Sequence, residues 1–172
     1  MAEATATIPN DTELRAHAEA LGLRLVAAAS RIAVAESCTG GWLAKVLTDV
    51  PGSSVWFEQG FVTYSNEAKA RTLGVSALVL DANGAVSEAV VREMADGARR
   101  AASTAAAIAI SGVAGPGGGT PDKPVGLVWI AWSLGDSEWA ERCVFAGDRE
   151  AVRRQAVARA MLGLLAKLND PA

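Results

Sequence analysis

Residues 32–41, with the sequence IAVAESCTGG, constrain the fold more than any other stretch of the chain. A short apolar run rich in β-branched residues gives way abruptly to small polar residues and two glycines, and a helical pattern follows over residues 42–48. This order predicts a buried strand, a tight turn and the start of a helix. The turn is therefore expected to lie at an edge of a sheet in an α/β protein.

The predicted turn carries groups that suit two kinds of chemistry. A helix N-terminus favours negative charge, and the expected one lies beside the hydroxyls of Ser37 and Thr39 and the amides near Gly40 and Gly41. The turn could therefore hold a phosphate or an oxyanion. Ser37 is also a possible nucleophile beside possible oxyanion donors. However, Ser, Thr and Gly are ordinary residues at the start of a helix, so this stretch alone leaves a purely structural turn open.

Strand and helix patterns alternate along the rest of the chain. We expect helices that begin at Asn10 or Asp11, at residue 66, at residue 88 after Ser87 (through 101), and after Asp148. Strands are expected at 55–64, 105–111, 125–132 and 138–145. Residues 77–80 are expected to be a short apolar segment before a turn. The pattern predicts one three-layer α/β/α sandwich with a mixed, mostly parallel sheet over residues 10–172, behind a mobile tail at 1–9.

Composition excludes several classes of protein. The net charge of the 172 residues is -3 and the basic residues are dispersed among acids, which argues against a nucleic-acid partner. No apolar run approaches the ~20 residues of a membrane span. Two cysteines and no signal-peptide pattern favour the cytoplasm. A single histidine, His17, argues against histidine-based metal sites and a Ser-His-Asp triad, so a base for Ser37 must be another residue type.

Lys69 occupies an unusual place for a lysine. It falls in the first or second turn of the helix expected from residue 66, where the helix macrodipole opposes a cation and lowers the lysine pKa. It follows Tyr64, which the preceding strand delivers to the same sheet edge as Ser37. Two interpretations remain: a surface lysine paired with Glu67, or a lysine that acts as a base for Ser37.

Residues 111–124 form the most glycine-rich segment, directly after a buried strand. Closely spaced glycines, among them Gly115, Gly117 and Gly118, allow positive φ or close approach to a ligand, while three prolines stiffen the segment. A ligand-binding loop and a flexible connection are both compatible with this pattern. Arg149, at the start of the last helix, could reach an anionic ligand or form an exposed salt bridge.

Six motifs occur along the chain: AESCTGG (35–41), VPGSS (50–54), TYSNEAK (63–69), GAVSE (84–88), GPGGGTPDKPVG (115–126) and GDR (147–149). In content and order they resemble the signature blocks of the CinA C-terminal domain family. The amidohydrolases of that family deamidate nicotinamide mononucleotide to nicotinate mononucleotide and ammonia, a step of pyridine-nucleotide salvage. The resemblance implies this activity for the chain, with no metal or cofactor, and a homodimer.

The resemblance also implies roles for individual residues. It makes Ser37 the nucleophile, Lys69 its base and Tyr64 an aid to proton transfer or orientation. The remaining residues that it implies contact the substrate, through oxyanion donors near the turn and through a ribose and phosphate site: Thr39, Gly40, Gly41, Ser111, Gly115, Gly117, Gly118 and Arg149. At Ser111 many family members carry threonine, so this contact keeps its hydroxyl and loses a methyl group.

Three alternatives accompany this interpretation. The domain could be a nucleotide-binding regulatory module without turnover, although such a module needs no base beside a nucleophile. It could be an amidase for another small carboxamide, which would share the chemistry and differ in the pocket. Cys38, next to Ser37, is a rival nucleophile, but adjacent side chains usually point in different directions.

Overall fold

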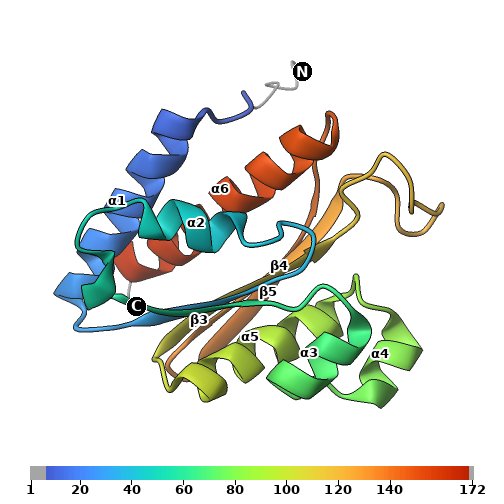
Figure 1. The fold of residues 1–172 in the computed structure, drawn as a ribbon, viewed down its shortest axis with the longest axis horizontal. Coiled ribbons are helices and arrows are strands. Elements are labelled where there is room, and N and C mark those ends of the chain that lie inside the picture. Colours follow the sequence, from blue (N-terminus) through green and yellow to red (C-terminus); the bar gives the residue numbers. More distant parts are fainter. Residues whose placement is uncertain (1–6, 171–172) are drawn as a thin grey trace.

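The computed structural model describes residues 7–170, which form a five-stranded sheet between two layers of helices (Figure 1). The elements are α1 (Asp11–Ala27), β1 (Ile32–Glu36), α2 (Trp42–Thr48), η1 (Ser53–Val55), β2 (Phe57–Val62), α3 (Asn66–Leu73), α4 (Ala77–Asn83), α5 (Glu88–Ala102), β3 (Ala106–Gly112), β4 (Leu127–Leu134), β5 (Ser137–Val144) and α6 (Arg149–Asn169). The predicted three-layer α/β/α sandwich is confirmed. Most of the predicted tail, residues 1–6, lies outside the described residues.

The strand order is β2-β1-β3-β4-β5. β1 pairs in parallel with β2 and β3, whereas β4 is antiparallel to both β3 and β5. Four strands therefore run in one direction and β4 alone runs in the other, as expected for a mixed, mostly parallel sheet. The consequence for function is that β1, β2, β3 and β5 all end at the same edge of the sheet, where β4 begins.

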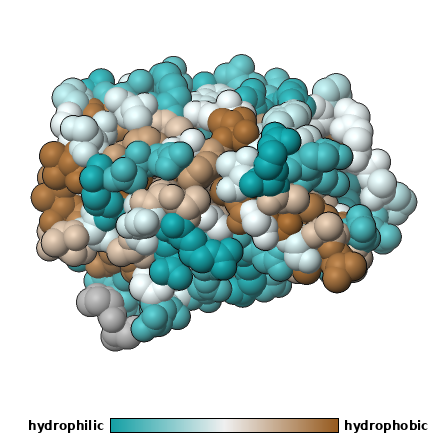
Figure 2. Space-filling model, turned by 60° about the horizontal axis from the view of Figure 1, so that its bottom comes forward, coloured by the Kyte–Doolittle hydropathy of each residue, from teal (hydrophilic) through white to brown (hydrophobic). Residues whose placement is uncertain are grey.

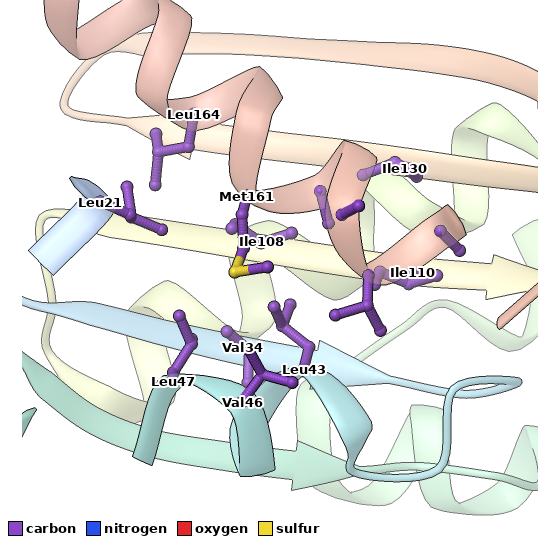
Figure 3. Packing of buried hydrophobic residues seen from close by; sticks show 14 of the residues in the cluster. Leu21, Val34, Leu43, Val46, Leu47, Ile108, Ile110, Ile130, Met161 and Leu164 are labelled. Atoms are coloured by element: carbon purple, nitrogen blue, oxygen red, sulfur yellow. The ribbon is translucent and has the colours of Figure 1, made fainter. Parts of the chain in front are cut away.

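Each face of the sheet has its own hydrophobic core. The helices α1, α2 and α6 cover one face, and Figure 3 shows Leu43 and Val46 of α2 pointing with Met161 of α6 toward Ile108 on β3. The helices α3 and α5 pack a second core against the other face, with Met94 fully buried. Figure 2 shows this second side from outside, where hydrophobic residues form separate patches among hydrophilic ones.

The helices begin where capping side chains satisfy their first amides. Asn10 accepts from the amide of Glu13 at 2.9 Å, and the Glu13 carboxylate accepts from the amide of Asn10 at 2.7 Å, which forms a capping box. Ser65, Ser87 and Asp148 accept in the same way at α3, α5 and α6. The predicted starts of the first, fifth and last helices are therefore confirmed.

Two predictions for the middle of the chain were wrong. Residues 77–80 belong to the helix α4, because Ser76 caps its first turn and Gly84 ends it, so this segment is more than a short apolar stretch before a turn. The strand predicted at 55–64 is shorter, because residues 53–55 form a 3-10 turn before β2 begins at Phe57. Within residues 7–170, no helix is both long and apolar enough to cross a bilayer.

Candidate active site

The residues singled out in the sequence converge at the edge where four strands end (Figure 1). The turn at 37–41 follows β1, residues 63–65 follow β2, and the glycine-rich segment connects β3 to β4. The start of α6 follows β5 at the same edge. Ligands of open α/β sheets bind beyond the carboxyl ends of the strands, so this edge is the candidate active site.

Ser37 and Lys69 are in direct contact. The Nζ atom of Lys69 donates to Oγ of Ser37 at 3.0 Å, and Lys69 is only 1% exposed. Ser65 fixes the start of α3 just after β2, which turns Lys69 inward on the first full turn of the helix. The interpretation of Lys69 as a surface residue paired with Glu67 is therefore wrong.

The environment of the Lys69 amine is neutral. Its other acceptors are the main-chain carbonyl oxygens of Thr63, at 2.7 Å, and Tyr64, at 3.4 Å. No carboxylate of residues 7–170 lies within 4.0 Å of Nζ. Burial therefore lowers the pKa of the Lys69 ammonium below its usual value, with the neighbouring Cys38 acting weakly in the opposite direction. A lysine in this state can accept a proton from a hydroxyl.

The backbone of the 37–41 turn is fixed from both ends. The amide of Ser37 donates to the carbonyl of Ile110 on β3 at 3.0 Å, and the amide of Gly40 donates back to the carbonyl of Ser37 at 3.0 Å. Gly40 and Gly41 have φ values of 59° and 96°, which residues with a side chain rarely adopt. The two glycines therefore let the chain pass from the strand into α2 within a single turn.

Glu36 is a functional-site residue that the sequence interpretation missed. Its carboxylate is fully buried and accepts hydrogen bonds from the amides of Gly41 at 3.1 Å, Leu43 at 3.1 Å and Ala44 at 2.8 Å. The N-terminus of α2 is thus occupied by the protein's own carboxylate. A signal was present in the sequence: an acidic residue ends a buried apolar strand immediately before the turn.

The hydrogen bonds within the 37–41 turn decide which of its amides remain available to a ligand. The amides of Gly40 and Gly41, expected near the oxyanion, are engaged by the carbonyl of Ser37 and the carboxylate of Glu36. Among residues 7–170, the amides of Cys38 and Thr39 have no acceptor. The Thr39 hydroxyl is itself buried and has no partner in the described part of the chain.

Cys38 is poorly suited to act as the nucleophile. Its side chain is buried, and burial raises the pKa of the thiol to about 11. Near neutral pH the group is therefore a thiol rather than the reactive thiolate. Ser37, which already contacts an amine, is the better nucleophile of the two adjacent residues.

Arg149 joins two segments of the site. One guanidinium nitrogen donates to the carbonyl of Gly115 at 2.7 Å and another to the hydroxyl of Tyr64 at 3.1 Å. Tyr64 is 61% exposed, and its hydroxyl contacts neither Ser37 nor Lys69. Tyr64 thus lies at the rim of the site, where only its main-chain carbonyl reaches the lysine.

The predicted residues of the glycine-rich segment fall into two groups. Ser111 is buried and its hydroxyl donates to the carbonyl of Ala85 at 2.8 Å, so it ties β3 to the chain before α5 and faces away from solvent. Gly115 and Gly118 both have φ of 82°, which requires glycine, whereas a Cβ at Gly117 would meet nothing within 4 Å. The segment is therefore a shaped loop with open space beside Gly117.

The whole chain resembles known proteins of one family. The model of the CinA C-terminal domain matches residues 14–168. A nicotinamide-nucleotide amidohydrolase, PncC, from Escherichia coli K12 is 55% identical over 152 residues, which span 88% of this chain and 92% of that relative.

Solved structures agree with this match. A CinA superfamily protein from Klebsiella pneumoniae has a TM-score of 0.88 and 42% identity, covering 91% of this chain and 98% of its own. The competence/damage inducible protein CihA from Agrobacterium tumefaciens has a TM-score of 0.89 and 36% identity, covering 96% and 99%. The chain belongs to the CinA C-terminal domain family.

Proposed function

We propose that this protein hydrolyses the carboxamide of nicotinamide mononucleotide to nicotinate mononucleotide and ammonia, as the name of its relatives as nicotinamide-nucleotide amidohydrolases suggests. The observation that carries the proposal is the contact, at 3.0 Å, between the hydroxyl of Ser37 and the buried amine of Lys69, which has no carboxylate partner among residues 7–170. A protein that only bound nucleotides would have no use for a lysine of lowered pKa beside a nucleophile.

In the proposed reaction, Ser37 Oγ attacks the carboxamide carbon while Lys69 Nζ takes the hydroxyl proton. The tetrahedral intermediate collapses, its carbon–nitrogen bond breaks, and Lys69 gives the proton to the departing ammonia. Water then attacks the acyl-enzyme, and Lys69 takes its proton and returns it to Ser37. The products are nicotinate mononucleotide and free enzyme, so atoms and protons balance without a cofactor.

The nucleotide part of the substrate would lie against the rim of the site. Arg149 supports this because its guanidinium is already held between Tyr64 and Gly115 and can contact a phosphate from there. The loop with Gly115, Gly117 and Gly118 would cover the ribose. Thr39, Gly40 and Gly41 would shape the pocket around the carboxamide. Ser111 would act indirectly, because its bond to the Ala85 carbonyl anchors the start of the glycine-rich segment.

Three further predictions complete this proposal. Residues 10–172 are proposed to act as a single domain that carries the whole reaction. A homodimer and a cytoplasmic location, which the resemblance and the composition suggest, stay predictions, and light scattering on the purified protein measures the first of them. The only partner that the proposed reaction requires is the small-molecule substrate.

The test is ammonia release from nicotinamide mononucleotide by the purified protein, with and without a chelator. We expect chelator-resistant release that Ser37→Ala abolishes, while Cys38→Ala, which removes the rival thiol, still releases ammonia. Bound nucleotide without release would identify a regulatory module. Absence of binding would point to an amidase for another carboxamide, and either result would overturn the proposal.

A further inference from the structure

Arg153 is bound to the turn that carries Ser37, although 115 residues separate it from Cys38 in the chain. Its Nε donates to the carbonyl of Cys38 and its Nη2 to the carbonyl of Thr39, each at 3.0 Å. The guanidinium also lies over the ring of Trp42, 5.3 Å from the centroid, which limits its movement. Arg153 follows Arg149 by one turn of α6, so one helix reaches both the rim and the base of the site.

The two bonds help to fix which way two peptide groups of the turn face, together with the amide of Trp42, which also donates to the Thr39 carbonyl at 3.1 Å. A trans peptide is planar, so its N–H points opposite to its C=O. Because Arg153 binds the carbonyls of Cys38 and Thr39, the following amides, those of Thr39 and Gly40, face away from it. The amide of Gly40 reaches the main-chain carbonyl of Ser37 at 3.0 Å, so the side of the turn away from Arg153 is closed by a bond to the backbone of Ser37 itself.

The Thr39 amide belongs to the peptide group that Arg153 holds by the Cys38 carbonyl. It has no acceptor among residues 7–170, whereas the amides of Gly41, Leu43 and Ala44 are all taken by Glu36. Thr39 is fully buried, so Arg153 acts on this part of the protein through the backbone that carries Ser37, two residues before Thr39.

We propose that Arg153 is a positioning residue of the amidohydrolase reaction, which holds the Cys38 and Thr39 carbonyls so that the hydroxyl of Ser37 stays at the Lys69 amine and faces the substrate carboxamide. This inference rests on the proposed function. Arg153 itself contacts no reacting atom. Its effect is therefore on the attack of Ser37 Oγ on the carboxamide carbon, and ground-state binding changes little.

Arg154 provides a matched control on the same helix. It too lies over Trp42, at 4.9 Å, but its donors go to Asp11 at 2.5 Å, Glu150 at 3.0 Å and the carbonyl of Pro9 at 3.4 Å. It makes no hydrogen bond to the 37–41 turn. Arg153→Gln and Arg154→Gln therefore remove the same charge from neighbouring positions, and only the first releases the turn.

The experiment measures kcat and KM for nicotinamide mononucleotide in the wild type and in both variants. We expect Arg153→Gln to lower kcat by about tenfold to a hundredfold, since a misplacement of about 1 Å at a reacting group costs about a hundredfold. KM should change less than about threefold, and Arg154→Gln should keep the wild-type values. In Arg153→Ala, added guanidinium at millimolar concentration should recover part of kcat.

The outcomes separate the two proposals. A wild type that releases no ammonia overturns the function and this inference with it. An active wild type with an unchanged kcat in Arg153→Gln, or with a change only in KM, overturns the positioning role alone. Circular dichroism gives the folded fraction of each variant. The positioning role is also overturned if kcat falls only in proportion to the folded fraction and Arg153→Lys does not restore part of kcat.

Discussion

Gly97 links the packing of two helices to the geometry of the site. A Cβ added at Gly97 in α5 would lie 2.0 Å from the carbonyl oxygen of Leu73, at the end of α3. Ordinary contact begins at 3.4 Å, so α3 would have to retreat by about 1.4 Å, the difference between the two distances. α3 also carries Lys69, one helical turn before Leu73.

Gly97→Ala should therefore damage both stability and activity. Overpacking costs about 1–3 kcal/mol, and the better helix propensity of alanine offsets about 1 kcal/mol of it, so we expect the free energy of unfolding to fall by up to about 2 kcal/mol. If even half of this shift reached Lys69, the 3.0 Å contact between Lys69 Nζ and Ser37 Oγ would lengthen beyond hydrogen-bond distance. A misplacement of this size is expected to lower kcat by about a hundredfold.

Urea unfolding and ammonia release measure the two effects separately. Gly22→Ala is the control, because its Cβ would also collide inside the protein, 2.7 Å from the Trp56 ring, but α1 carries no residue of the site. Both variants should lose stability, and only Gly97→Ala should lose kcat. Equal kcat values in the two variants would refute the link between α5 packing and the Lys69 position.

Two more predictions concern Lys69 and Ser111. Because burial lowers the pKa of Lys69, kcat/KM should rise with pH through a single ionisation below 10.5, and this step should vanish in Lys69→Arg. A midpoint at or above 10.5 would contradict the role of burial. The same shift means that the unfolded chain binds more protons between the folded pKa and 10.5, so urea titrations should show wild type gaining stability relative to Lys69→Met as pH rises through that window. Ser111→Ala should lower the free energy of unfolding by about 1 kcal/mol, because the Ala85 carbonyl loses its donor, and Ser111→Thr should recover it; equal stability of all three proteins would show that this bond contributes nothing.

Local signals in the sequence were sufficient to predict most elements. Asn10, Ser87 and Asp148 mark helix starts because a cap involves only residues three or four positions apart. The helix α4 escaped prediction because its seven residues contain barely two turns, too few for a helical periodicity to be distinguished from a short apolar run.

The site was predictable only in part. The strand-end rule of α/β sheets brings Ser37 and Lys69 to one edge, and the structure adds their contact at 3.0 Å. The sequence interpretation attributed a lowered lysine pKa to the helix dipole, whereas burial is its main cause. The bonds from Arg153 to the turn escaped prediction because no local pattern connects positions 115 residues apart.

The buried carboxylate of Glu36 has a consequence for how the protein recognises its ligands. Many α/β proteins bind a ligand's phosphate on the amides that open a helix, but here an internal anion already fills that place at α2. At this turn the attraction of a negatively charged ligand is left to exposed cations such as Arg149, whose field is screened within about 8–10 Å at physiological ionic strength. High salt should therefore weaken capture of the ligand, while the turn that presents Ser37 keeps its shape.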